Sequence, residues 1–179
     1  QLPFVYKEGY RYRPRINLQD PVMKDMISPM ENTVYFLPNS DARQSQIYFY
    51  IPMGDYNREE NVRREAFNQY ISGGFSGLIM NEIREKNSMA YTAYGFASSR
   101  GLPGAQTYFS GYIDTQNDKA VDAIDLYMKL LTDMPERPGR IDNIKSYLRQ
   151  SALTDHPDSR NLSLRIAEWK RRGYTDDPA

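Results

Sequence analysis

Alternating apolar and polar positions predict four β-strands that come in two adjacent pairs. Residues 33–37 and 46–51 are short β-rich runs with a turn sequence between them, and we expect them to pair antiparallel. Residues 90–98 and 105–113 also alternate and are rich in aromatic and small side chains. The loop between these two runs is rich in Gly and contains a Pro, so the runs predict a β-hairpin.

Apolar residues at helical spacing predict two helices between the strand pairs. The first is expected over residues 58–71, with Asn57 as its N-cap, and the second over residues 75–86. The glycines that separate them lack the lysine and the spacing of a phosphate-binding loop, so we interpret residues 72–77 as a kink. The expected inward side chains of the first helix are Val62, Ala66, Phe67 and Tyr70.

Three further helices are predicted after the hairpin. The first begins at a capping-box-like segment, residues 115–118, and the second runs over residues 141–154. The third is capped by Asp158 or Ser159 and ends at Gly173. The side chains expected to face inward are Ala120, Val121, Ile124, Tyr127, Met128 and Leu131 on the first helix, Ile144, Leu148 and Ala152 on the second, and Leu162, Ile166 and Trp169 on the third.

The predicted element order is β-β-α-α-β-β-α-α-α. Because the strands occur in adjacent pairs, we expect a largely antiparallel sheet with helices packed on one face, which is an α+β fold. Residues 1–30 contain scattered prolines and alternating Tyr and Arg, and they predict an irregular linker or arm. Residues 31–179 are expected to form a single α+β domain.

Composition excludes several kinds of function. The 23 Lys and Arg residues balance 23 Asp and Glu residues, so the chain lacks the positive field that attracts nucleic acid or anionic lipid. With no Cys and one His, it cannot form a disulfide, a thiolate or two-histidine metal site, or a cysteine nucleophile. No apolar run is long enough to span a membrane. The basic and aromatic N-terminal segment could stack on single-stranded nucleic acid, but we favour its packing against a neighbouring domain.

Few side chains present recognisable chemistry. His156 lies in a loop sequence without a serine or cysteine motif as its partner, so we expect it to be solvated. Glu82 and Glu85 share a helix face, but adjacent basic residues favour a solvated surface over acid–base work.

Arg84 and Tyr91 are the more informative pair. They lie near a helix end and at the start of the next strand, and the short turn between them would let their side chains converge. A guanidinium and a phenol are donors suited to a peptide carbonyl or its oxyanion. Spacing by itself favours a structural interpretation, in which Arg84 binds the last carbonyls of the helix and Tyr91 packs.

Three sequence blocks carry a resemblance to a known family. They are Gly73-Gly74-Phe75-Ser76-Gly77-Leu78, Asn81-Glu82-Ile83-Arg84-Glu85-Lys86 and Met89-Ala90-Tyr91. These blocks closely resemble a stretch of the pitrilysin/insulinase family of zinc metallopeptidases, and a more diffuse likeness covers residues 31–175. The resemblance implies a half-domain of the LuxS/mitochondrial-processing-peptidase type, paired with a second half around an enclosed chamber.

The resemblance also implies a division of labour between the halves. In this family the zinc-binding half carries an H-x-x-E-H helix, and the corresponding residues 61–68 contain no His. The chain therefore resembles the companion half, with no metal of its own and with zinc expected in the partner half. By the family pattern, Arg84 and Tyr91 would bind the peptide substrate and stabilise the oxyanion. The implied partners are a zinc-binding half, in the same or another polypeptide, and a peptide.

Three functional hypotheses follow, of which a nucleic-acid binder that uses the N-terminal segment is the least favoured; the other two share the family fold. The chain is either part of a zinc endopeptidase, with no activity expected in isolation, or a catalytically inactive structural or protein-binding module of the same fold. A family half usually continues past Asp177, so we expect the half-domain to be truncated at its C-terminus. The first residue is Gln1 rather than Met, which favours a processed protein or a fragment. The sequence does not specify the compartment, and an exported location such as the periplasm is one hypothesis.

Overall fold

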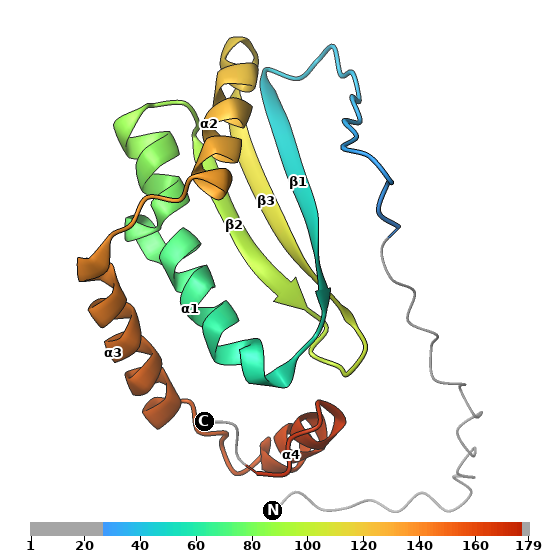
Figure 1. Ribbon diagram of the computed structural model, residues 1–179, viewed down its shortest axis with the longest axis vertical. Coiled ribbons are helices and arrows are strands. Elements are labelled where there is room, and N and C mark those ends of the chain that lie inside the picture. The colour runs from blue at the N-terminus through green and yellow to red at the C-terminus, as the bar shows by residue number, and fades with distance from the viewer. Residues whose placement is uncertain (1–26, 177–179) are drawn as a thin grey trace, which may run out of the picture.

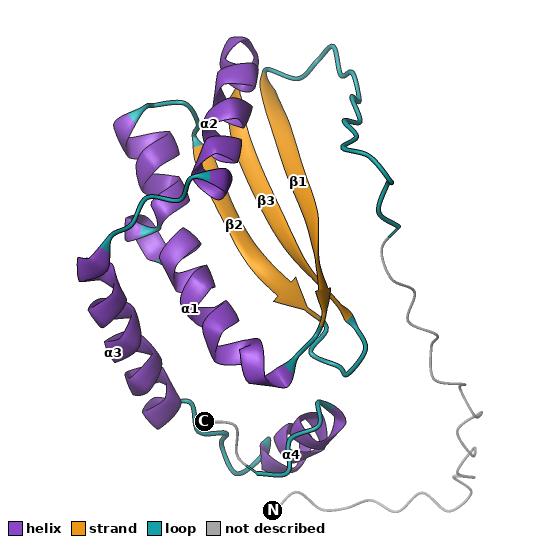
Figure 2. Ribbon diagram, viewed as in Figure 1, coloured by secondary structure: helices purple, strands orange, loops and turns teal. Residues whose placement is uncertain are grey.

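The computed structural model describes residues 27–176, in which three antiparallel strands carry helices on one side (Figures 1 and 2). The strands are β1 (Gln44–Asp55), β2 (Thr92–Ser99) and β3 (Gln106–Gln116), in the order β1-β3-β2. The predicted hairpin is formed by β2 and β3. The antiparallel α+β architecture expected from the sequence is thus confirmed.

The helices are α1 (Asn61–Ser72), a π-helix (Met80–Lys86), α2 (Ala120–Thr132), α3 (Pro138–Thr154) and α4 (Leu162–Arg171). In Figure 1, α1, the π-helix and α2 lie over one face of the sheet, and α3 packs outside α1. Each predicted helix is present, with shifted ends. Asn57 caps a 3-10 turn, Arg58–Glu60, that leads into α1 rather than α1 itself: its side-chain oxygen accepts a hydrogen bond from the Glu59 N–H at 2.9 Å.

The strand predicted over residues 33–37 does not form. Val34, Tyr35, Phe36 and Leu37 are between 79% and 91% exposed, and the strand that was expected to pair with them, β1, pairs with β3 instead. A β-rich sequence becomes a strand only where it finds a ladder partner and a face to bury. β1 is also longer than predicted, because a bulge carries the ladder past Pro52 and Gly54. Most of the predicted N-terminal arm lies outside the described residues.

The predicted start of α2 is wrong, and its predicted inward face is right at Tyr127 but wrong at Val121 and Met128. Thr115 does not cap the helix, because β3 continues through this residue and its hydroxyl donates to the Met89 carbonyl instead. The buried residues of α2 are Ala123, Tyr127 and Leu130, whereas Val121 and Met128 are exposed. Val62 on α1, and Leu162 and Ile166 on α4, were likewise expected to face inward and are exposed.

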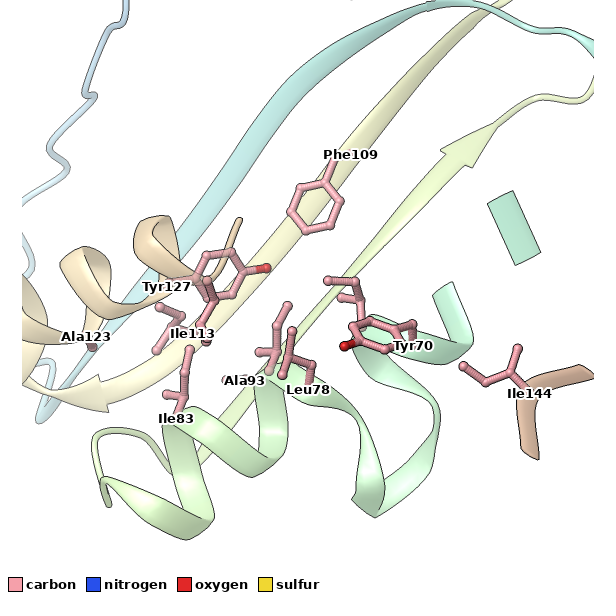
Figure 3. Packing of buried hydrophobic residues seen from close by; sticks show 12 residues of the cluster. Tyr70, Leu78, Ile83, Ala93, Phe109, Ile113, Ala123, Tyr127 and Ile144 are labelled. Carbon is pink, nitrogen blue, oxygen red and sulfur yellow. The ribbon is translucent and has the colours of Figure 1, made fainter. Parts of the chain in front are cut away.

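Tyr127 sets the orientation of α2. Its ring stacks on Phe49 with the centroids 4.3 Å apart, and its hydroxyl donates to the Tyr94 carbonyl at 2.9 Å. Figure 3 shows this ring reaching from α2 into the core beneath β3. The hydroxyl fits because Gly95 and Gly111 lie opposite each other in the ladder, and a Cβ on either glycine would overlap its oxygen. Burial raises the pKa of Tyr127 above its ordinary value, and its phenol is a hydrogen-bond donor at neutral pH.

The edge of β2 that faces away from β3 is bound by side chains of α1. Asn68 Nδ2 donates to the Ala97 carbonyl at 2.9 Å, and its Oδ1 accepts from the Ala97 N–H at 2.7 Å. One turn later, the Ser72 hydroxyl accepts from the Gly95 N–H at 2.8 Å. These contacts satisfy backbone groups that would otherwise be left unpaired beneath a helix.

We expect Asn68→Ala to lower the free energy of unfolding by about 2 kcal/mol, because it leaves a part-buried backbone donor and acceptor without partners. Urea unfolding followed by circular dichroism measures this change. Asn143→Ala, on the exposed face of α3, is the matched control and should change stability by less than about 0.5 kcal/mol. Equal stability of the two variants would show that Asn68 does not anchor β2.

Candidate functional site

A tight turn connects the π-helix to β2 and carries the two residues singled out in the sequence. The N–H of Ser88 donates to the Arg84 carbonyl at 3.0 Å, and the N–H of Met89 donates to the Ile83 carbonyl at 2.9 Å. Ser88 adopts a positive φ of 50°, which reverses the chain at the end of the helix. Tyr91 therefore lies close to the helix end that carries Arg84.

The same turn is fixed to the end of the central strand. The Tyr91 N–H donates to the Asp114 carbonyl at 2.9 Å, and the Thr115 hydroxyl donates to the Met89 carbonyl. Thr115 is almost completely buried. The backbone of the turn is thus held from the π-helix on one side and from β3 on the other, which limits the positions that its side chains can adopt.

Arg84 and Tyr91 meet at the surface. The guanidinium carbon of Arg84 lies 5.8 Å from the centroid of the Tyr91 ring, which is within the range of a cation–π contact. Arg84 Nε is also 3.5 Å from a carboxylate oxygen of Glu85. The Tyr91 side chain is exposed, and 41% of the Arg84 side chain remains accessible. The guanidinium thus lies near the Tyr91 ring, and both side chains are open to solvent.

The pair borders an open depression of about 440 Å³. Its lining includes Gln44, Gln116 and Lys119 from the ends of β1 and β3 and the following turn. Lys119 Nζ donates to the Ser88 carbonyl at 3.2 Å, and sequence analysis did not single this residue out. The lining of the depression includes the cations of Arg84 and Lys119 and the phenol of Tyr91, with Glu85 as its carboxylate. The depression is therefore rich in hydrogen-bond donors, which suits a carbonyl oxygen or an oxyanion.

The two glutamates near the site have different environments. Glu82 accepts hydrogen bonds from Lys86 Nζ at 2.9 Å and from Arg137, and only 15% of its side chain is exposed. The expectation that Glu82 is solvated is therefore wrong, because it ties the π-helix to the segment that leads into α3. Arg137 is 55 residues away in sequence, and no local pattern could have identified it. Glu85 is exposed, as expected.

The donor set of the described residues does not fit a metal. Residues 27–176 contain no group of three His, Cys, Asp or Glu side chains that could hold an ion. Helix α1 presents Asn61 and Glu65, joined by a hydrogen bond of 2.9 Å, and carries no imidazole. His156 lies exposed in the loop between α3 and α4. Within the same range, no helix is both long enough and apolar enough to cross a membrane.

Comparison with known proteins identifies a family and a similar solved structure. A family model described as "Peptidase M16 inactive domain" matches residues 17–145. A crystal structure of a peptidase M16 inactive domain from Pseudomonas fluorescens is similar with a TM-score of 0.53 and 17% sequence identity. The similar region covers 74% of this chain and 31% of the Pseudomonas fluorescens chain. This chain therefore spans about a third of the length of that protein. At this identity the likeness shows the fold. No curated protein sequence matches significantly.

Proposed function

The chain belongs to the family of peptidase M16 inactive domains, and from this membership we propose that it is the companion half of a zinc metalloendopeptidase. The family match confirms the resemblance to the non-metal half of pitrilysin/insulinase peptidases that residues 73–91 suggested. In the proposed role, the chain helps to enclose a peptide and binds its backbone. The partner is a zinc-binding half of the same family, in the same polypeptide or in another.

The observation that supports this role most directly is the proximity of Arg84 and Tyr91 at an open, donor-rich depression. When a peptide carbonyl is attacked, its oxygen gains negative charge, and a donor placed at that oxygen lowers the barrier. The phenol of Tyr91 and the guanidinium of Arg84 would donate to this oxygen or to the neighbouring peptide backbone. Their cation–π contact holds the two groups in one geometry before the substrate arrives.

The division of labour follows from the side chains that this chain has. With one His and no Cys, and with no suitable carboxylate cluster in residues 27–176, zinc is assigned to the partner half. The metal would polarise the carbonyl and activate water there, with a general base from the same half. This chain would then supply positioning and charge stabilisation only.

A second function stays open because the family description itself is "inactive domain". A half with the same fold could serve as a structural or protein-binding subunit without contributing to turnover. The two functions differ in one respect that can be measured, which is whether the cleavage rate depends on Arg84 and Tyr91.

We expect the isolated chain to retain no zinc after dialysis and to leave a quenched fluorescent peptide intact. Mixed with its zinc-binding half and zinc, it should increase cleavage of the same peptide. The zinc content is measured by atomic absorption, and cleavage by fluorescence. One equivalent of zinc retained by the isolated chain would contradict the assignment of the metal to the partner. Equal cleavage by the zinc-binding half with and without this chain would favour the structural module.

A further inference from the structure

Two consecutive backbone carbonyls in the turn of residues 87–91 are bound by side chains from the junction of β3 and α2. The Lys119 amine donates to the Ser88 carbonyl at 3.2 Å, and the Thr115 hydroxyl donates to the Met89 carbonyl. Both donors lie outside the π-helix and β2, the two elements that the turn connects. The turn is therefore attached, through side chains, to a part of the fold that is distant from it in sequence.

Thr115 is the last inward-facing residue of β3. It follows Ile113 by two residues, so its side chain lies on the face of the sheet that packs against the helices. Ile113 belongs to the same buried cluster as Ile83 of the π-helix (Figure 3), and Thr115 itself is almost completely buried. The apolar core thus ends at a residue whose hydroxyl meets the backbone of the turn. An apolar side chain of the same shape would leave the Met89 carbonyl without this donor.

The conformation of Ser88 makes the turn dependent on such contacts. Its φ of 50° lies in the left-handed region, which costs free energy for a residue that has a Cβ atom. Backbone in this region persists where the surrounding contacts hold it. The carbonyl of Ser88 and the next one along the chain are the two that Lys119 and Thr115 bind. We therefore expect the turn to relax when the Thr115 hydroxyl is removed.

A relaxed turn would displace the phenol of Tyr91. Met89 is held by the Thr115 side chain, and two residues later the Tyr91 N–H donates to the Asp114 carbonyl at 2.9 Å. The backbone on both sides of Ala90 is thus fixed by adjacent residues of β3. Because the hydroxyl of a tyrosine lies at the far end of its side chain, a small rotation of the backbone moves it further than the backbone itself. A misplacement of about 1 Å can lower a rate by about 10²-fold.

A purely structural contribution of Thr115 is the alternative. In that case the hydroxyl stabilises the fold by satisfying a buried carbonyl, and its removal has the same effect whether or not Tyr91 has a phenol. A contribution to positioning differs in this respect, because it has no consequence for the rate once the group to be positioned is absent. The two contributions can therefore be separated by experiment.

We propose that Thr115 is a positioning residue for Tyr91, which acts through the Met89 carbonyl and does not touch the peptide. Its hydroxyl holds the turn in the one conformation that places the phenol of Tyr91 for donation to the substrate carbonyl. Lys119 supports the same conformation at Ser88. This inference rests on the proposed function, because it assigns to Thr115 the geometry of a group that the proposed function uses.

The kinetic test uses the peptidase assembled from this chain and its zinc-binding half. Thr115→Val keeps the shape of the side chain and removes the hydroxyl, and we expect it to lower kcat about tenfold. Thr115→Ser keeps the hydroxyl and should stay within about threefold of the wild type. In a Tyr91→Phe background, Thr115→Val should lower kcat by less than about twofold, because no phenol remains to be positioned.

A second readout does not depend on turnover. Hydrogen exchange of individual amides, followed by NMR in the full 179-residue chain, reports whether the turn opens. The Tyr91 N–H should exchange at least about tenfold faster in Thr115→Val than in the wild type or in Thr115→Ser. The Ala97 N–H, which the Asn68 side chain binds further along β2, should exchange as in the wild type.

Thr107→Val is the matched control. Thr107 is also buried on the inward face of β3, and its hydroxyl has no hydrogen-bond partner among the residues that the structure describes. The variant should therefore keep the wild-type kcat and the wild-type exchange rate of the Tyr91 N–H. If Thr115→Val does not fold, Thr115→Ala takes its place in each comparison.

Three results would each overturn the inference. They are an equal loss of kcat from Thr115→Val with and without the Tyr91 phenol, a Thr115→Ser variant as slow as Thr115→Val, and exchange of the Tyr91 N–H that is no faster in Thr115→Val than in Thr107→Val. Full turnover in Tyr91→Phe would instead contradict the proposed function, and the exchange rates would then still test whether Thr115 holds the turn.

Discussion

Tyr91→Phe should lower kcat of the peptidase assembled from this chain and its zinc-binding half by at least about tenfold, toward about 10²-fold. The substitution removes one hydroxyl and keeps the ring, so the cation–π contact with Arg84 and the hydrogen bond from the Tyr91 backbone persist. The loss should fall on kcat more than on KM, because the oxygen that accepts the hydroxyl gains its charge in the transition state. Initial rates with a quenched peptide over a range of concentrations separate the two constants.

The matched control is Tyr147→Phe, which removes a phenol hydroxyl from an exposed position on α3 and should leave both constants unchanged. Arg84→Lys is informative in addition, since it keeps the charge and loses the planar fork. We expect this variant to raise KM if Arg84 holds the peptide backbone. Full turnover in Tyr91→Phe would rule out a catalytic contribution of the phenol and favour a structural or protein-binding module.

The parts of the site that are formed by residues close together in sequence could be predicted from the sequence. The hairpin of β2 and β3 and the turn between Arg84 and Tyr91 depend on short-range turns and alternation, which can be recognised within a few residues of the chain. The family resemblance added the proposed roles of the two side chains. The proximity of the guanidinium and the phenol in the structure supports those roles, which the kinetic experiment tests.

Features that depend on long-range pairing could not be predicted. Tyr48 and Tyr94 lie on either side of Tyr112 because of the register of β1 and β2 on β3, and no local pattern specifies the register of β1. The segment 33–37 has the composition of a strand, but it lacks a ladder partner among the described residues and is exposed. On α2, Tyr127 was correctly expected to face inward, whereas Val121 and Met128 were not. The hollow that receives the Tyr127 hydroxyl could not be predicted, because its two glycines lie on different strands and meet only after these strands pair.

Gly111→Ala should destabilise the fold by about 3–5 kcal/mol, or enough to prevent folding, although it adds only one methyl group. The added Cβ would overlap the hydroxyl oxygen of Tyr127 and lie 2.8 Å from its Cζ. The backbone at Gly111 cannot shift easily, because β3 is the central strand, and the Tyr127 ring cannot move easily, because it is stacked on Phe49. The variant must therefore shift α2 or give up the hydrogen bond from Tyr127 to the Tyr94 carbonyl.

Gly139→Ala is the control for the added methyl group. This glycine lies in the first turn of α3, and no atom lies within 4 Å of the position that a Cβ would take there. Alanine should therefore keep stability or raise it by up to about 1 kcal/mol. Urea unfolding of both variants gives the comparison.

Combining Gly111→Ala with Tyr127→Phe tests the cause of the destabilisation, because removing the hydroxyl relieves the closest overlap. The double variant should lose less stability than the sum of the two single losses. Additive losses, or a Gly111→Ala variant as stable as Gly139→Ala, would show that α2 does not dock through this tyrosine. The position of α2 on the sheet would then be wrong.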